Sequence, residues 1–148
     1  MTTPAHTTHA SPASTSRRRA RAIAVLAAAL VPAGIWLVAV PLLGYELLAP
    51  QWGGPPAEVT LPLVVVGALA ASLLGWGLLA VLERRTGRAR TIWTVIALAV
   101  LVVSFTPLLD PEIATATRII LGLMHLAVAA VLIPGLTRGA PRLDAAWR

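Results

Sequence analysis

The chain has 148 residues, of which 57% are hydrophobic and 12% are charged, and its formal net charge is +6 at pH 7. A water-soluble domain of this size needs a polar surface that such a composition does not supply, so we expect an all-α integral membrane protein. The positive charge does not indicate nucleic-acid binding, because the arginines flank hydrophobic segments, where they set orientation and meet anionic lipid headgroups. There is no cysteine, which excludes disulfides and thiolate ligands.

The chain begins with a polar tail and a first apolar segment. Residues 1–16 are rich in Thr, Ser, Pro, Ala and His without apolar periodicity, which predicts a disordered tail. Four arginines between residues 17 and 21 then precede an apolar run, which we assign to a membrane span at residues 22–43. The order of charge and apolar run is also that of a signal peptide, but no small-residue cleavage site closes the run, and we expect it to be retained.

The second predicted span covers residues 61–82, after a loop at residues 49–59 that is dense in Pro and Gly. Within this span Gly67, Ala71 and Gly75 recur every four residues. In lipid, a face without large side chains lets another helix approach closely, so these residues are predicted to pack against another helix of the bundle or a second subunit. Chance spacing in an Ala-rich chain is the alternative.

Two more spans follow, predicted at residues 91–107 and 111–136. Asp110, Pro111 and Glu112 have the order of a helix start, with Asp as N-cap and Pro at the first helical position. The chain then ends in a basic tail, residues 139–148. We therefore predict a single four-helix transmembrane bundle over residues 17–138.

The distribution of arginine predicts the orientation of this bundle. All twelve basic residues are arginines, and eleven lie before the first span, between the second and third, or after the fourth. With four spans these segments share one side, whereas Glu46, Glu58, Asp110 and Glu112 fall on the other. Because basic loops stay in the cytoplasm, we expect both termini to be cytoplasmic in a multi-pass protein of the cell membrane, with anionic lipids at its cytoplasmic face.

The twelfth arginine, Arg118, lies in the fourth span together with His125. The two are seven residues apart and so share a helix face with Gly122 between them, separated by roughly 10 Å along the axis. Ionisable groups inside a span are costly and mark candidate functional sites. In the structural interpretation, Arg118 is anchored to lipid headgroups or to one of the carboxylates of Glu46, Asp110 and Glu112. His125 is then hydrogen-bonded to Ser72, Ser104 or a backbone carbonyl.

Two functions remain open on this sequence. The first is a structural or interaction component that binds a membrane-protein partner or another copy of itself. The alternative is a small carrier or binder of a lipophilic or protonatable ligand, using the face of Arg118 and His125. No nucleotide-binding loop, zinc motif or nucleophile elbow occurs, and His125 has no second ligand. We therefore expect no enzymatic activity, no cofactor and no metal.

Three segments carry a family resemblance. They are GWGLLAVLERR at residues 75–85, IW and SFTPLL between residues 92 and 109, and LMHLAVAAVLIPGL at residues 123–136. Over residues 20–138 the chain resembles a family of small actinobacterial four-helix integral membrane proteins of unknown function. The resemblance implies four spans and a plasma-membrane location, and it brings no catalytic or binding residues.

Overall fold

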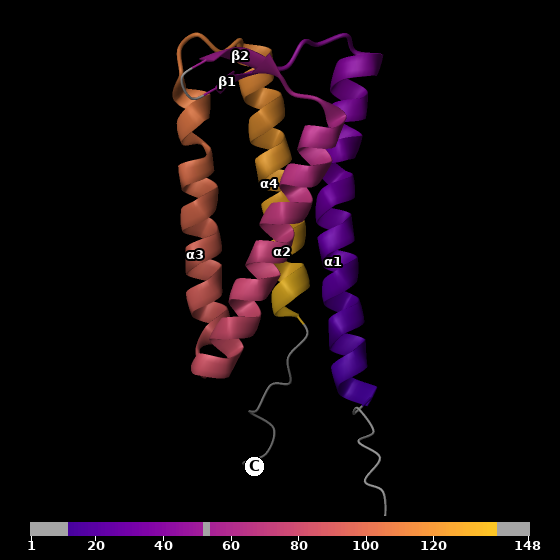
Figure 1. Ribbon diagram of the computed structural model, residues 1–148, viewed down its shortest axis with the longest axis vertical. Coiled ribbons are helices and arrows are strands. Elements are labelled where there is room, and N and C mark those ends of the chain that lie inside the picture. Colours follow the sequence, from indigo (N-terminus) through magenta and orange to yellow (C-terminus); the bar gives the residue numbers. More distant parts are fainter. Residues whose placement is uncertain (1–11, 52–53, 139–148) are drawn as a thin grey trace, which may run out of the picture.

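The computed structural model describes residues 12–51 and 54–138, which form a mostly helical chain with a small two-stranded sheet (Figure 1). Four of its helical segments are long and apolar enough to cross a membrane, namely Ser16–Leu42, Leu61–Arg85, Ala89–Leu109 and Thr115–Thr137. The predicted four spans are confirmed to that extent. The tail predicted at residues 139–148, and the first eleven residues, lie outside the described part of the chain.

The first helix, α1 (Pro12–Leu37), begins before the predicted span. Residues 12–16 were assigned to the disordered tail, yet they form the start of this helix. Proline suits the first helical position, and the arginines and alanines that follow favour helix, so the helix continues outward past the apolar run. Pro32 lies inside it.

The far end of α1 passes directly into a π-helical turn, η1 (Val38–Leu42), which contains Pro41. Proline has no N–H to donate. The backbone hydrogen bonds of this turn join residues five positions apart, as in the 3.0 Å bond from the Leu43 N–H to the Val38 carbonyl. Gly44 then has a φ of 71°, the left-handed conformation that ends helices at low cost for glycine.

A β-hairpin, β1 (Leu48–Gln51) and β2 (Gly54–Glu58), covers one end of the bundle (Figure 1). The strands are antiparallel, with Leu48 opposite Glu58 and Ala49 opposite Ala57. The sequence predicted a loop at residues 49–59, and the structure instead pairs most of this segment as two strands. Proline and glycine keep the segment out of a helix, and strand pairing then satisfies its backbone N–H and carbonyl groups. The indole N–H of Trp36 donates to the Val59 carbonyl at 2.6 Å and fastens the hairpin to α1.

The next two helices, α2 (Leu61–Arg85) and α3 (Ala89–Ser104), are joined by a tight turn at the opposite end. Trp93 of α3 is almost fully buried, and its indole N–H donates to the Gly75 carbonyl of α2 at 2.7 Å. A 3₁₀ turn, η2 (Thr106–Leu109), extends α3 toward the hairpin end. The third span thus reaches its predicted end at residue 107 only with this added turn.

The last helix, α4 (Thr115–Thr137), starts later than predicted. The Asp110 carboxylate accepts the Glu112 N–H at 3.0 Å, and the Asp110 carbonyl accepts the Ile113 N–H at 3.2 Å. Asp110 therefore caps a local turn instead of the helix, a competing use of its side chain that is common in loops.

Helix α1 packs against both α2 and α4, and α3 lies at the edge against α2 and α4 (Figure 1). The start of α1, the turn between α2 and α3 and the end of α4 form the arginine-rich end of the bundle (Figure 1). One buried cluster lies toward this end and consists of Ala28, Leu79, Trp93, Leu132 and Leu136. A second lies toward the hairpin end and consists of Leu47, Val59, Leu108, Leu121 and Met124.

The four spans differ in how much they bury inside the chain. In their most apolar stretches, 39% of the first span and 28% of the fourth are buried, against 11% for each of the second and third. Helices α2 and α3 therefore present most of their apolar surface outward. In a bilayer that surface meets lipid or another protein.

Candidate functional site

The predicted polar face of Arg118, Gly122 and His125 lies where α4 meets the end of α3. Gly122 is buried, and a Cβ built on it would lie 3.3 Å from the ring of Phe105 and 3.8 Å from the side chain of Leu108. Contacts of 3.3 Å are already tighter than normal packing, so Phe105 fills the space beside this glycine. At its centre the face therefore contacts protein.

Arg118 reaches back toward the start of its own helix. Its Nη2 donates to the main-chain carbonyl of Asp110 at 2.9 Å and to that of Ile113 at 3.5 Å. Its Nε is buried and has no hydrogen-bond partner in the described part of the chain. Arg118 thus binds the turn between η2 and α4 through backbone oxygens, whereas the sequence suggested a carboxylate or a headgroup as its anchor.

His125 is half-buried beside Phe105, with the two ring centroids 6.2 Å apart and the rings tilted by 50°. Its Nδ1 lies 2.7 Å from the Leu121 carbonyl, one turn back on α4. A carbonyl oxygen only accepts, so Nδ1 carries the hydrogen and donates it. Of the partners considered from sequence, the backbone carbonyl is the one that the structure places within reach.

Neither of the two serines considered as partners is hydrogen-bonded to His125. The hydroxyl of Ser104 donates to the Leu101 carbonyl of its own helix at 2.6 Å. Ser72 is fully buried on α2, and its hydroxyl has no hydrogen-bond partner among the described residues. The Arg118 Nη2 and the His125 Nδ1 therefore bond separately to backbone carbonyls close to them, and no hydrogen bond links the two side chains in the described part of the chain. This arrangement favours a role in packing over a shared reactive site.

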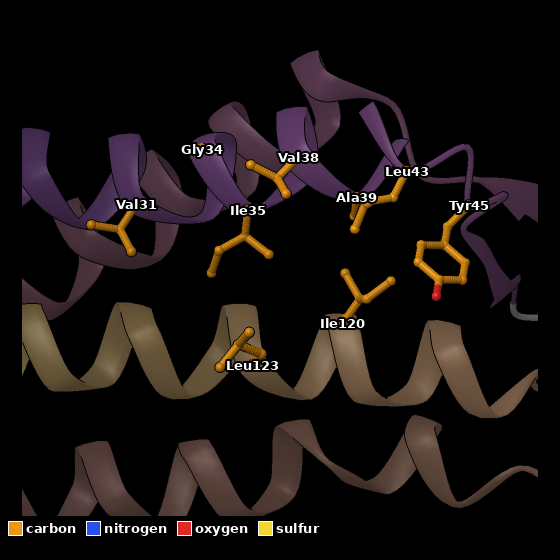
Figure 2. Close-up of a pocket in the computed structure, with 9 residues that line it drawn as sticks. All are labelled: Val31, Gly34, Ile35, Val38, Ala39, Leu43, Tyr45, Ile120 and Leu123. Carbon is orange, nitrogen blue, oxygen red and sulfur yellow. The ribbon is translucent and has the colours of Figure 1, made fainter. Parts of the chain in front are cut away.

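An apolar groove lies between α1 and α4 toward the hairpin end, with a volume of about 590 Å³ (Figure 2). It is lined by Val31, Gly34, Ile35, Val38, Ala39, Leu43, Tyr45, Ile120 and Leu123. The Tyr45 hydroxyl at one end is the polar side-chain group of this lining (Figure 2). A surface of this chemistry suits hydrocarbon such as a lipid chain.

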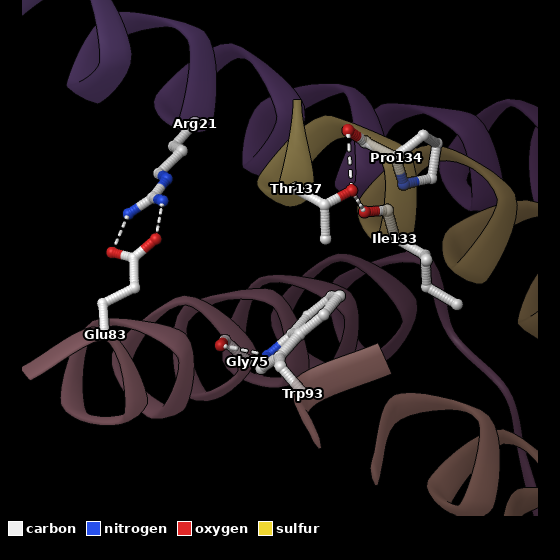
Figure 3. Close-up of polar contacts among 7 residues, drawn as sticks. All are labelled: Arg21, Gly75, Glu83, Trp93, Ile133, Pro134 and Thr137. Atoms are coloured by element: carbon white, nitrogen blue, oxygen red, sulfur yellow. Dashed lines mark hydrogen bonds and ion pairs between the residues drawn. The ribbon is translucent and has the colours of Figure 1, made fainter. Parts of the chain in front are cut away.

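An ion pair that sequence reasoning missed links α1 to α2 at the arginine-rich end (Figure 3). The Arg21 guanidinium donates through Nη1 to one carboxylate oxygen of Glu83 at 3.0 Å and through Nη2 to the other. The Arg21 side chain is 10% exposed and that of Glu83 is 32% exposed. The available signal was Glu83 itself, a lone acidic residue beside the arginines of residues 84–90.

The predicted packing stripe on α2 divides into two parts. A Cβ on Gly75 would contact Trp93 at 3.6 Å and Leu132 at 3.7 Å, so this glycine faces the bundle. Gly67 and Ala71 are exposed, and nothing lies within 4 Å of a Cβ built on Gly67. Of the three residues of the stripe, Gly75 is thus the one with another helix against it in the described part of the chain, and contact of Gly67 and Ala71 with a second subunit stays a prediction.

Comparison with known proteins gives a family for almost the whole chain. Residues 12–142 match the model of a family described as "Family of unknown function (DUF6069)". The prediction of a family of unknown function is thereby confirmed, and the match extends beyond residues 20–138, where the resemblance was noted. No curated protein and no solved structure matches the chain.

Proposed function

Because the chain belongs to the family of unknown function DUF6069, whose description assigns no role, we propose a function from its own geometry. The protein is an interaction component of the cell membrane, and it associates with a second copy of itself through the outer face of α2. The observation that carries this proposal is the exposed small-residue surface at Gly67 and Ala71 on a span that buries only 11% of its apolar stretch inside the chain.

The side chains around these two residues favour association between helices. Leu63 and Leu74 flank them on the same exposed side of α2, at 53% and 74% exposure. Helices associate in lipid by close backbone approach and van der Waals packing, which a shallow small-residue surface between larger side chains permits. A second copy is the simplest partner, because one face then supplies both surfaces of a symmetric interface.

The alternative function, a carrier or binder that uses Arg118 and His125, receives less support. Phe105 fills the space beside Gly122, and both polar side chains bond to nearby backbone carbonyls. A ligand at that face would have to displace Phe105. The apolar groove between α1 and α4 lies against other residues of α4, namely Ile120 and Leu123.

We propose further that both termini are cytoplasmic. Support comes from the arrangement in Figure 1, where the start of α1, the turn between α2 and α3 and the end of α4 lie at one end of the bundle. The described arginines other than Arg118 belong to these segments, so the basic end faces the cytoplasm and anionic lipid. A plasma-membrane location in an actinobacterium is proposed from the sequence resemblance alone.

The proposed association predicts that Ala71→Leu weakens dimer formation without unfolding the chain. A leucine at this position separates the two helices, and a loss of about 1 to 3 kcal/mol corresponds to roughly a 5- to 150-fold weaker association. Energy transfer between labelled copies in lipid vesicles, measured at increasing protein density, gives the association constant. Thermal melting in detergent should stay close to that of the unmodified protein, because Ala71 is exposed within one chain.

The matched control is Ala99→Leu, the same substitution at an exposed position of α3. It should leave energy transfer unchanged. If the unmodified protein shows no density-dependent transfer, or if the two variants behave alike, the α2 interface does not exist.

A further inference from the structure

A second groove, of about 340 Å³, lies at the arginine-rich end where α3 begins and α4 ends. Its lining consists of Arg90, Thr91, Thr94, Val95 and Thr137. Four of these five side chains are polar, in contrast to the apolar surface that the spans otherwise present. Because both helices end here, the groove lies at the depth of the lipid headgroups if the spans cross a bilayer.

Arg90 is the charged group of this groove, and it is half-buried. No hydrogen bond or ion pair engages its side chain within residues 12–51 and 54–138. The nearby acidic residue Glu83 is already held by Arg21. A guanidinium presents several N–H donors in one plane and matches the oxygens of a phosphate, so Arg90 is suited to bind an anion of this kind.

The threonines add neutral donors on the same side as Arg90. The hydroxyls of Thr91 and Thr94 on α3 have no hydrogen-bond partner in the described chain and are available to donate. Thr137 differs, because its hydroxyl donates to the Ile133 carbonyl at 2.8 Å and to that of Pro134 at 3.4 Å (Figure 3). The donors therefore come from the first turns of α3, and Thr137 forms the opposite wall.

The surface that continues from the groove is apolar. Val95 is 61% exposed, and Ile92, Leu98 and Val102 are exposed along the same helix. These residues recur every three or four positions, so they form a stripe on one side of α3 that leads from the groove toward the hairpin end. A molecule with a phosphate could bind the polar side chains of the groove and lay its hydrocarbon along this apolar stripe.

We propose that this groove binds the phosphate of an anionic membrane phospholipid, with its acyl chains along the stripe of Ile92, Val95, Leu98 and Val102. Arg90 and the hydroxyls of Thr91 and Thr94 hold the phosphate oxygens. The neighbouring arginines, such as Arg88 and Arg138, favour a headgroup without a cation of its own. The inference rests on membrane insertion, which belongs to the proposed function, but not on association through α2.

The test is binding of phosphatidylglycerol to the purified full chain in detergent, measured by native mass spectrometry as the fraction of protein carrying one lipid. Arg90→Gln should weaken binding roughly tenfold or more, the usual loss when a hydrogen bond to a charged group is removed. Thr94→Val, which keeps the shape of the side chain, should weaken it several-fold. The matched control Arg84→Gln removes the same charge from an exposed residue at the same end and should change binding less than twofold.

The competing ligands distinguish a lipid site from a site for free phosphate. Phosphatidylcholine should bind more weakly than phosphatidylglycerol, and inorganic phosphate at millimolar concentration should not displace the lipid. Equal losses in Arg90→Gln and Arg84→Gln would show diffuse attraction and overturn the proposal, as would displacement by phosphate. Ala71→Leu should bind the lipid normally, so failure of the α2 interface and failure of this site are separate results.

Discussion

Replacing Gly135 with alanine is expected to destabilise the protein by about 1 to 3 kcal/mol, the usual cost of overpacking a well-packed interior. A Cβ at Gly135 would lie 2.5 Å from the Cβ of Ala24 on α1 and 3.6 Å from its Cα. The first distance is far below any normal carbon contact, and neither atom belongs to a flexible side chain. The helices α1 and α4 must therefore move apart. Because these are the two spans that bury the largest share of their surface inside the chain, the packing between them is weakened.

The same geometry supplies a rescue variant and a control. In the double variant Ala24→Gly with Gly135→Ala the short contact disappears and the 3.6 Å approach to the Ala24 Cα is ordinary, so most of the stability should return. A Cβ built on Gly77 has nothing within 4 Å, so Gly77→Ala should leave the stability unchanged or raise it slightly, as expected for glycine to alanine in a helix. Thermal melting in detergent measures all three, and a Gly135→Ala protein as stable as Gly77→Ala would contradict the packing of α1 on α4.

The second large effect is expected at the ion pair between α1 and α2. Glu83→Gln removes the carboxylate that accepts two hydrogen bonds from Arg21, whose side chain is only 10% exposed. Hydrogen bonds to charged groups contribute about 1.5 to 3 kcal/mol, and the buried arginine is left without its counter-charge. Because Glu83 itself is 32% exposed, the expected loss lies at the lower end of that range.

A double-mutant cycle separates this pair from a general effect of charge. Arg21→Gln should destabilise by a similar amount, and the double variant should lose much less than the sum of the two single losses. The control Glu112→Gln changes an exposed carboxylate at the other end and should alter melting little. Additive losses in the cycle would mean that Arg21 and Glu83 do not stabilise each other.

Much of the fold follows from local sequence. Long apolar runs determine the helices, because a span must satisfy its backbone groups internally. The Pro and Gly residues between 49 and 59 interrupt the helices but do not reveal that β1 pairs with β2. The hydrogen bond from Trp36 to the Val59 carbonyl, which holds the end of the hairpin on α1, joins residues far apart in the sequence. The start of α4 was placed too early, because an Asp before a Pro suits a turn as well as a helix.

The site features depended on contacts between distant residues, which local patterns do not contain. Helical periodicity placed Arg118, Gly122 and His125 on one face of α4. It could not show that Phe105, from another helical segment, packs against this face. The spacing of Gly67, Ala71 and Gly75 did not show which of them faces the bundle. Likewise, Gly135 gave no signal of its close approach to α1.

We propose a four-span protein whose arginine-rich end faces the cytoplasm, and cysteine labelling in whole cells measures this orientation. The chain has no native cysteine, so Glu58→Cys in the hairpin and Gly87→Cys in the turn between α2 and α3 each carry a single reactive thiol. Both positions are exposed, and Gly87 has nothing within 4 Å of an added Cβ. We expect a membrane-impermeant thiol reagent to label Glu58→Cys in intact cells, and Gly87→Cys only after the cells are opened. Labelling of Gly87→Cys in intact cells would contradict the orientation, and labelling of both would contradict the four spans.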